Sequence, residues 1–110
     1  MIEHMRPLDQ TKATADALAS LGHEARLSMY RLLVRAGYDG LNVGEIGEQL
    51  DLPASTLGHH LRALVKSGLV IQEKRGREVI NKPNFDAMER MLAYLTEECC
   101  TGVEVRFNAG

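Results

Sequence analysis

The chain has 110 residues, of which 45% are hydrophobic and 25% charged, and its formal net charge is −2. This composition is typical of one folded domain and excludes a disordered chain. The sequence contains no apolar run near the roughly 18 residues of a membrane span, and its first ten residues lack the apolar core of a signal peptide. We therefore expect a cytoplasmic protein with no membrane partner, whose two cysteines are thiols rather than a structural disulfide.

Positive charge is concentrated in one segment of this acidic chain. Residues 54–82 contain six Lys and Arg and two Glu, a net charge of +4, which leaves −6 for the remainder. A local basic face can neutralise phosphates even when the whole protein is acidic. The net charge therefore does not exclude a nucleic-acid partner. The six cations are Arg62, Lys66, Lys74, Arg75, Arg77 and Lys82.

A first helix is predicted over residues 9–21. Asp9 is the expected N-cap, and Gly22 is the expected stop signal. One side of this helix carries small or apolar residues that suit close packing against another helix. These are Ala15, Leu18 and Ala19.

Two further helices are predicted between residues 23 and 50. One spans residues 23–36 and is ended by Gly37. The other is predicted from Asn42 and Glu45, which have the spacing of a capping box, and runs to Leu50. The residues expected to face the core are Leu27, Tyr30, Leu33 and Val34 in the first of these helices, and Val43, Ile46 and Leu50 in the second.

Residues 53–70 predict a fourth helix with one apolar and one polar side. Pro53 suits the first helical position, and Gly68 suits a left-handed cap. The apolar stripe follows the helical period and consists of Leu57, Leu61, Leu64 and Val65. The other faces carry side chains that can hydrogen-bond base edges and phosphates: Ser55, Thr56, His59, Arg62 and Lys66. Taken alone, the segment also fits an ordinary amphipathic surface helix.

The sequence on both sides of this helix favours a DNA-binding role. Only residues 51–53 separate it from the preceding helix, which is the tight connection of a helix-turn-helix, here over residues 42–68. Residues 69–75 and 78–82 predict two strands around Gly76, a wing over residues 70–82 with Arg75 and Arg77 near its tip. The predicted fold is mainly α with a small β-hairpin. It is a winged helix-turn-helix of about five helices plus a two-stranded wing, which forms a single domain over residues 1–110.

A last helix is predicted over residues 85–100, with Asn84 as its N-cap. A domain of this size has little interior left for another apolar stripe, so we expect part of it to face a second subunit. Helix-turn-helix proteins normally read two half-sites related by a two-fold axis. Packing of the stripe on its own domain is the alternative, and residues 101–110 are expected to be a frayed tail or a short strand. The stripe consists of Phe85, Met88, Leu92, Leu95 and Cys99.

Three segments together resemble the ArsR/SmtB family of metal-responsive repressors: LGHEARLSMYRLL, ASTLGHHLRALVKSGLV and REVINKPNFDAM. The similarity covers about residues 13–100, and residues 55–70 are its most specific part. The resemblance implies a homodimer whose interface is made by the helices over residues 9–21 and 85–100. It also implies a repressor that binds an inverted-repeat operator in double-stranded DNA and leaves it when an effector binds. The residues that inherit DNA contacts are Ser55, Thr56, His59 and Arg62 for base reading, and Arg75 and Arg77 for the wing.

The effector sites of the family transfer less readily to this chain. The arsenic- and cadmium-sensing branch opens its third helix with a Cys-x-Cys element, where this chain has Asn42 and Gly44. The zinc- and cobalt-sensing branch uses an Asp/His set on the last helix, where this chain offers Asp86 but no histidine. His59 and His60 point about 100° apart on a helix and form a poor chelating pair. One of them is expected to be packed or to contact phosphate.

Cys99 and Cys100 are the expected effector site and the only expected metal ligands. Some family members bind trivalent arsenic through a cysteine pair at this place, usually with a further cysteine that this chain lacks. Two thiolates fit a soft centre that needs two sulfurs, such as a monomethylated trivalent arsenical. Inorganic arsenite prefers three, and would need a hydroxide, a small thiol or a cysteine of the partner chain. No resident cofactor is expected; the alternative is a buried Cys99 with an incidental Cys100.

Three other functions stay open. A thiol-redox sensor would use the same cysteines, although Glu97, Glu98 and the preceding helix C-terminus disfavour a thiolate. A cysteine phosphatase or arsenate reductase would use Cys100 and Arg106, which match C-x5-R; that phosphate-binding loop opens a helix, whereas this one follows a helix. A winged helix that has lost DNA binding would serve as a dimerisation or interaction module. We expect no enzymatic activity.

Overall fold

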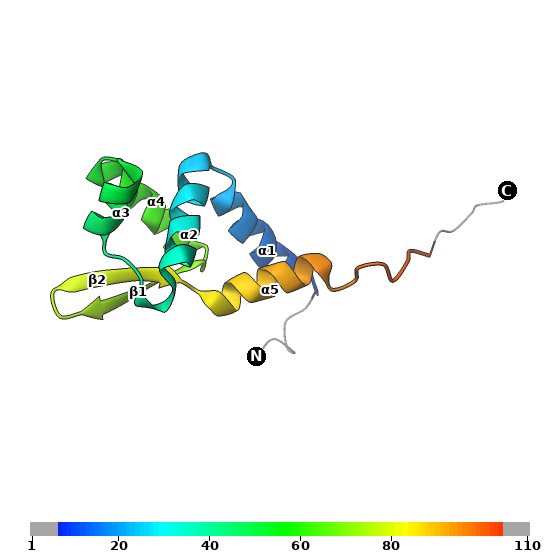
Figure 1. Cartoon of the computed structure of the whole chain (residues 1–110). Helices are drawn as coiled ribbons and strands as arrows, with labels where there is room; N and C mark the ends of the chain where they lie inside the picture. The colour runs from blue at the N-terminus through cyan, green and yellow to red at the C-terminus, as the bar shows by residue number, and fades with distance from the viewer. Residues whose placement is uncertain (1–6, 105–110) are drawn as a thin grey trace.

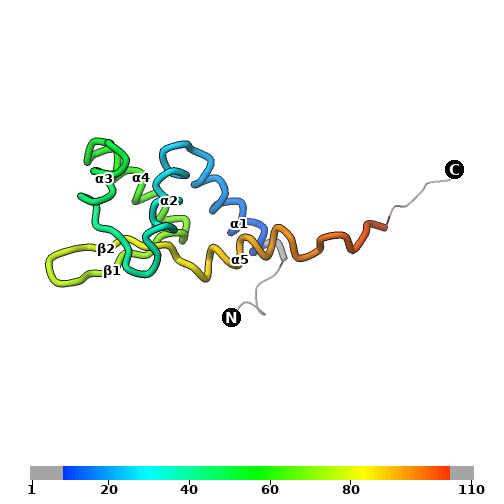
Figure 2. Tube along the Cα trace, in the orientation of Figure 1, coloured from blue at the N-terminus to red at the C-terminus, as the bar shows by residue number. Residues whose placement is uncertain are grey.

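The computed structural model describes residues 7–104 and has a winged helix-turn-helix architecture, as predicted (Figure 1). Figure 2 shows that the helix-turn-helix and the wing lie at one end of the molecule, and α1 and α5 at the other. No helix in the described residues is long and apolar enough to cross a membrane. The elements are α1 (Pro7–Leu21), α2 (Glu24–Ala36), the 3-10 turn η2 (Gly37–Asp39), α3 (Val43–Leu50), α4 (Ala54–Lys66), β1 (Val70–Arg75), β2 (Glu78–Pro83) and α5 (Phe85–Thr96).

One hydrophobic core joins the helices to the base of the wing. It is built from apolar residues of α1, α2, α3, α4, β1 and α5, so each element contributes its inner face to the same interior. Burial of such side chains is the main favourable term in folding. This core fixes α4 on its inner side and leaves the other side to solvent. The largest fully buried apolar side chains are Met29, Leu33, Ile46, Leu64 and Leu69.

The boundaries of the helix-turn-helix follow from local backbone chemistry. Asn42 and Glu45 form the predicted capping box at the start of α3, with reciprocal hydrogen bonds of 2.8 and 2.9 Å. At the end of α4, the N–H of Leu69 bonds the carbonyl of Leu64, and Gly68 adopts a left-handed φ of 83°. This is the Schellman arrangement, which satisfies the last helical carbonyls. Pro53 is the N-cap rather than the first helical residue, because its ψ of 148° is extended.

The wing is a two-stranded antiparallel sheet attached to the helical body at its base. Its strands pair from Val70 opposite Pro83 to Arg75 opposite Glu78, so only Gly76 and Arg77 form the turn. At the base, Leu41 exchanges two backbone hydrogen bonds of 2.9 and 2.8 Å with Asn81. The segment after η2 thus makes one antiparallel bridge to β2, which attaches the wing to the helical body.

Three other predicted helix boundaries need correction. The first helix begins at Pro7, so Asp9 lies in its first turn rather than at the N-cap. A carboxylate in the first turn interacts favourably with the positive end of the helix dipole. His23 precedes α2 as its N-cap, and its Nδ1 accepts from the N–H of Ala25 at 3.2 Å. The last helix ends at Thr96 instead of near residue 100. Two consecutive glutamates follow Thr96, and negative charge at a helix C-terminus is unfavourable.

Several predicted core positions are exposed in the protomer. Tyr30, Leu33 and Ile46 are buried as predicted, but Leu27, Val34 and Val43 are 38–46% exposed. The helical phase of α2 is rotated so that Met29 and Leu32 face inward instead. When apolar residues lie on two sides of a helix, the sequence does not determine which side faces the core. Packing against the other elements determines it. The predicted small stripe of α1 is exposed as well: Ala15, Leu18 and Ala19.

Candidate nucleic-acid interface

Helix α4 separates its buried and exposed side chains as the sequence predicts. Leu57, Leu61 and Leu64 are at most 5% exposed, and they anchor the helix to the core. Thr56 and Val65 lie between the two sides and are half-buried. The side chains left on the solvent side can donate hydrogen bonds to bases or phosphates. They are Ser55, His59, Arg62 and Lys66.

His60 belongs to the packed side of α4 and not to the reading face. It is 5% exposed, and its Nδ1 accepts a hydrogen bond of 3.1 Å from Nε of Arg26 on α2. The His23 ring also packs beside it, with ring centroids 4.7 Å apart. Burial and these cationic neighbours lower the pKa of His60 below its usual value. The neutral imidazole therefore connects α2 to α4, and one histidine of the adjacent pair is packed, as expected.

A groove of about 520 Å³ lies between α4 and the wing. Arg62 from α4 and Arg77 from the hairpin turn both line it, so the fold brings these two predicted cations together. Val43 and Val79 give it an apolar part, and both are exposed. Such a surface combines charge for phosphates with methyl groups that can contact thymine methyls. In this groove, side chains of α4 and of the wing can contact the same ligand.

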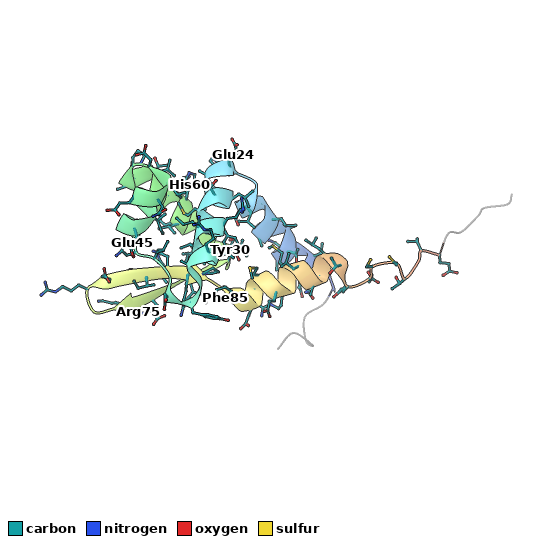
Figure 3. All side chains as sticks on the ribbon, viewed as in Figure 1. Glu24, Tyr30, Glu45, His60, Arg75 and Phe85 are labelled. Atoms are coloured by element: carbon teal, nitrogen blue, oxygen red, sulfur yellow. The ribbon has the colours of Figure 1, made fainter. Side chains whose placement is uncertain are left out.

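The other face of the wing holds its charges in a local network. Glu73 pairs with Lys82 at 2.8 Å and with Arg75 at 3.2 Å. These two partners lower the pKa of Glu73 to about 2. Arg75 also donates to the carbonyl of Asp39 at 3.4 Å, so its guanidinium is directed at the body of the protein. Glu45 and Arg75 lie on opposite sides of the wing in Figure 3.

Strand alternation places a second wing cation, Lys74, on the same side of the wing as the groove. Lys74 is opposite Val79, and both share a face with Gln72 and Asn81, which line the groove. Lys74 is exposed, and it takes part in none of the ion pairs among the described residues. Lys74 is not among the wing contacts predicted from the sequence, which are Arg75 and Arg77. Because alternate residues of a strand face the same side, counting back from the turn could have placed Lys74 on this face.

Polar contacts fix the wing relative to the helix-turn-helix. The Asn42 side chain, which caps α3, also donates to Glu78 at 2.8 Å. Asn81 is 1% exposed; its amide donates to the carbonyl of Leu41 at 3.1 Å and accepts from Gln72 at 2.9 Å. A buried amide with both groups bonded resists movement, because leaving either group unpaired is costly. The groove therefore has a set width in the free protomer.

The two cysteines lie in the turn that follows α5. Both are exposed, and their Sγ atoms are 3.1 Å apart. The hydrogen bond between the two thiols, together with partial desolvation, raises the pKa of Cys99. Cys100 has a left-handed φ of 66°. The expected alternative of a buried Cys99 is wrong, since Cys99 is exposed, and Arg106 of the C-x5-R match lies outside the described residues.

Further metal ligands are absent near these thiols in the described chain. Residues 7–104 contain no group of three or more His, Cys, Asp and Glu side chains able to hold a metal ion. One described protomer therefore offers two sulfur ligands and no third side chain. This arrangement suits a centre that needs only two sulfurs.

Fold and surface together define a winged helix-turn-helix protein, and comparisons with known proteins agree. Residues 21–73 match the family model for a helix-turn-helix domain. No curated protein gives a significant match. Among solved structures, an ArsR-like transcriptional regulator from a Rhodococcus species has a TM-score of 0.69 at 23% identity, with 79% of each chain covered.

Two further structures extend the comparison. The transcriptional repressor PagR of Bacillus anthracis has a TM-score of 0.64 at 25% identity, covering 74% of this chain and 93% of its own. A homodimeric winged helix-turn-helix DNA-binding domain from Mycobacterium bovis, a possible ArsR-family regulator, has a TM-score of 0.62 at 22% identity, with 90% of each chain covered. Residues 21–73 therefore match a helix-turn-helix domain, and the chain has the winged helix-turn-helix fold of these ArsR-like structures.

Proposed function

We propose that this regulator is a homodimeric repressor that leaves its operator when a soft trivalent arsenical binds Cys99 and Cys100. The observation that carries the proposal is the pair of exposed thiols 3.1 Å apart, directly after a helix whose apolar side is exposed. Two sulfurs at this separation can both bond one centre, because a metal–sulfur bond is about 2.3 Å long and both sulfurs can lie that far from the same atom. A monomethylated arsenical needs no third protein ligand.

Dimerisation is supported by apolar residues that one protomer leaves uncovered. Leu92 and Leu95 of α5 are 53% and 56% exposed, and Leu18 of α1 is 40% exposed. Helices α1 and α5 contact each other, and a hydrogen bond joins Thr11 to Tyr94. Covering these side chains with a second copy would remove apolar surface from water. The homodimeric Mycobacterium bovis relative lends the same support.

Operator binding uses the exposed side of α4 in a major groove and the wing cations on the flanking phosphates. In a two-fold dimer the two α4 helices would read half-sites about one DNA turn apart. A ligand at the end of α5 changes the packing of the dimer helices and so the spacing of the α4 helices. By linkage, the arsenical weakens DNA binding by the factor by which DNA weakens arsenical binding.

A redox-sensing repressor is the second candidate, and the short Sγ–Sγ distance favours it. Oxidation of Cys99 and Cys100 by a peroxide would break two S–H bonds and form one S–S bond; the two hydrogens and two electrons pass to the peroxide, which becomes two waters or, for an alkyl peroxide, an alcohol and a water. The raised pKa of Cys99 works against this reading, because the thiolate is the nucleophile. A soft arsenical still displaces the thiol protons through its strong bonds to sulfur.

Fluorescence anisotropy tests both candidates on one DNA fragment, selected from random sequence with the purified dimer. Monomethylarsenite, arsenite, zinc, cadmium and peroxide are added in turn. We expect release by the methylated arsenical at the lowest concentration, and no release from a Cys99→Ser/Cys100→Ser variant that still binds DNA. Release of that variant would refute the cysteine site, and release of the wild type by peroxide alone would establish the redox reading instead.

A further inference from the structure

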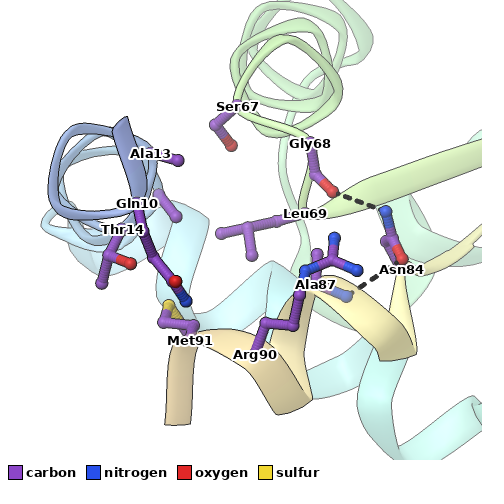
Figure 4. Close-up of a pocket in the computed structure, with 11 residues that line it drawn as sticks. Gln10, Ala13, Thr14, Ser67, Gly68, Leu69, Asn84, Ala87, Arg90 and Met91 are labelled. Carbon is purple, nitrogen blue, oxygen red and sulfur yellow. Dashed lines mark hydrogen bonds between the residues drawn. The ribbon is translucent and has the colours of Figure 1, made fainter. Parts of the chain in front are cut away.

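A second cavity, of about 490 Å³, lies between α1, α5 and the end of α4, away from both the DNA groove and the cysteines. Figure 4 shows α1 on one side, α5 below, and the turn from α4 into β1 above. Its volume is in the range of sites for small organic ligands, which extends from about 300 to 1,000 Å³. The apolar floor consists of Ala17, Leu69 and Met91, each at most 7% exposed.

Arg90 is the only charged side chain among the residues that line the cavity. Arg90 from α5 extends its guanidinium toward Leu69 in Figure 4, and Gln10 from α1 directs its amide into the same space. No carboxylate lies among the residues that line the cavity, all of them described. The ion pairs of the described chain involve other side chains, so Arg90 has no such partner. An unpaired guanidinium beside an apolar floor favours an anion with an apolar body.

The opposite wall is already internally bonded and therefore rigid. Asn84 donates to the carbonyl of Gly68 at 3.0 Å and accepts from the N–H of Ala87 at 3.2 Å. Ser67 donates to the carbonyl of Leu64 and accepts from Ser20. These groups do not compete for Arg90. The donors left for a ligand are therefore Arg90, Gln10 and the Thr14 hydroxyl.

We propose that this cavity binds a small organic carboxylate, whose anionic group pairs with Arg90 and whose apolar body rests on Leu69 and Met91. A guanidinium can bond both oxygens of a carboxylate at once. The site adjoins Gly68 and Leu69, the turn that ends the recognition helix and begins the wing. The ligand would thus fix the position of α4 relative to the dimer helices. This effector site does not depend on Cys99 or Cys100.

Isothermal titration of the full chain with octanoate and with salicylate tests the site directly, with octanamide as the uncharged control. We expect one saturable site per chain for a carboxylate and at least about tenfold weaker binding of octanamide, because a charge-assisted hydrogen bond is lost. Arg90→Gln should weaken carboxylate binding by a similar factor. Arg35→Gln removes an exposed arginine of α2 and should leave binding unchanged.

A second variant blocks the cavity and leaves the Arg90 guanidinium in place. Ala13 is exposed on α1 and lines the cavity, so Ala13→Phe should fill it and abolish binding while the chain stays folded. Sedimentation equilibrium is run on all variants. The proposal is overturned if neither acid binds, if Arg90→Gln binds as tightly as the wild type, or if both variants change only the dimer affinity, which would show that a second copy fills the cavity.

Discussion

The two ends of this molecule differ in how completely one protomer pairs their polar groups and buries their apolar side chains. At the DNA-binding end, α3, α4 and the wing are joined by a capping box, a backbone bridge and a fully bonded buried Asn81. At the other end, Leu92 and Leu95 of α5 are more than half exposed. The helix-turn-helix and the wing are therefore held in place within one chain, whereas we propose that a second copy completes the other end. Each prediction below tests one side of this comparison.

Disrupting the uncovered helix face should have the largest effect. Leu92→Glu/Leu95→Glu places two charges where a partner helix is proposed, and charges buried without partners are strongly disfavoured. We expect a monomer whose affinity for a two-half-site DNA falls by about 100-fold or more, because the second half-site is no longer tethered. Sedimentation and anisotropy measure both changes. A variant that stays dimeric would place the interface elsewhere.

A glycine at the base of the wing tests the preorganised end. Gly40 has a φ of 63°, and a Cβ there would lie 2.5 Å from Ile80 and 2.7 Å from the Asn81 carbonyl. Gly40→Ala should lower the free energy of unfolding by about 3 kcal/mol, from overpacking together with left-handed strain. Gly37→Ala is the matched control, since its φ is 71° but nothing lies within 4 Å. Equal losses of stability in urea would show that the wing base is not tightly packed.

These two regions also differ in how far the sequence predicted them. Local chemistry was sufficient for the capping box at Asn42 and the left-handed Gly68, because the partners of each lie within a few residues. It was insufficient for the contact between Arg26 and His60, which are 34 residues apart and meet only in the packed core.

The same limit explains the errors in helical phase and length. The sequence favoured Leu27 for the core, but packing turned Met29 inward. It extended the last helix to Cys100, although the structure ends it at Thr96, before two glutamates. The exposed polar side of α4 was predicted because its spacing is local. The cavity between α1, α5 and the end of α4 was missed because helices far apart in the sequence assemble it.

Removing one reading side chain should have an intermediate effect. Arg62 is exposed on α4 and lines the groove beside the wing. Arg62→Ala should cost about 1–3 kcal/mol of operator binding and relax the base preference at one position, as expected for a base-contacting arginine. Competition with single-base operator variants measures both. Unchanged operator affinity would mean that this side of α4 is not the reading face.

The two wing arginines should differ in salt dependence. Arg77 is in the hairpin turn and lines the groove, whereas Arg75 is held by Glu73 and the Asp39 carbonyl. Arg77→Ala should weaken all DNA sequences alike and reduce the salt slope by about 1, as for one lost phosphate contact. Arg75→Ala should change the slope less. The opposite ranking would show that DNA binding releases Arg75 from Glu73.

The smallest expected effect is a loss of stability in mild acid, through His60. Its pKa is lowered in the folded protein, so the unfolded chain takes up the proton first. Its contribution is therefore complete above the unfolded pKa of about 6.5 and is lost as pH falls through the lower folded value. Urea unfolding at pH 7.5 and 5.5 should show a smaller loss for His60→Gln than for the wild type. An equal loss would assign the acid sensitivity to other groups.

The most direct test of the division between reading and sensing ends is an NMR titration of the isotope-labelled dimer. Operator DNA is added first and monomethylarsenite second. The account predicts that DNA shifts the amide signals of residues 54–66 and 72–79, and that the arsenical shifts residues 96–101 and then reverses the DNA-induced shifts. Arsenical binding at residues 96–101 with the DNA-induced shifts retained would contradict coupling between the two ends.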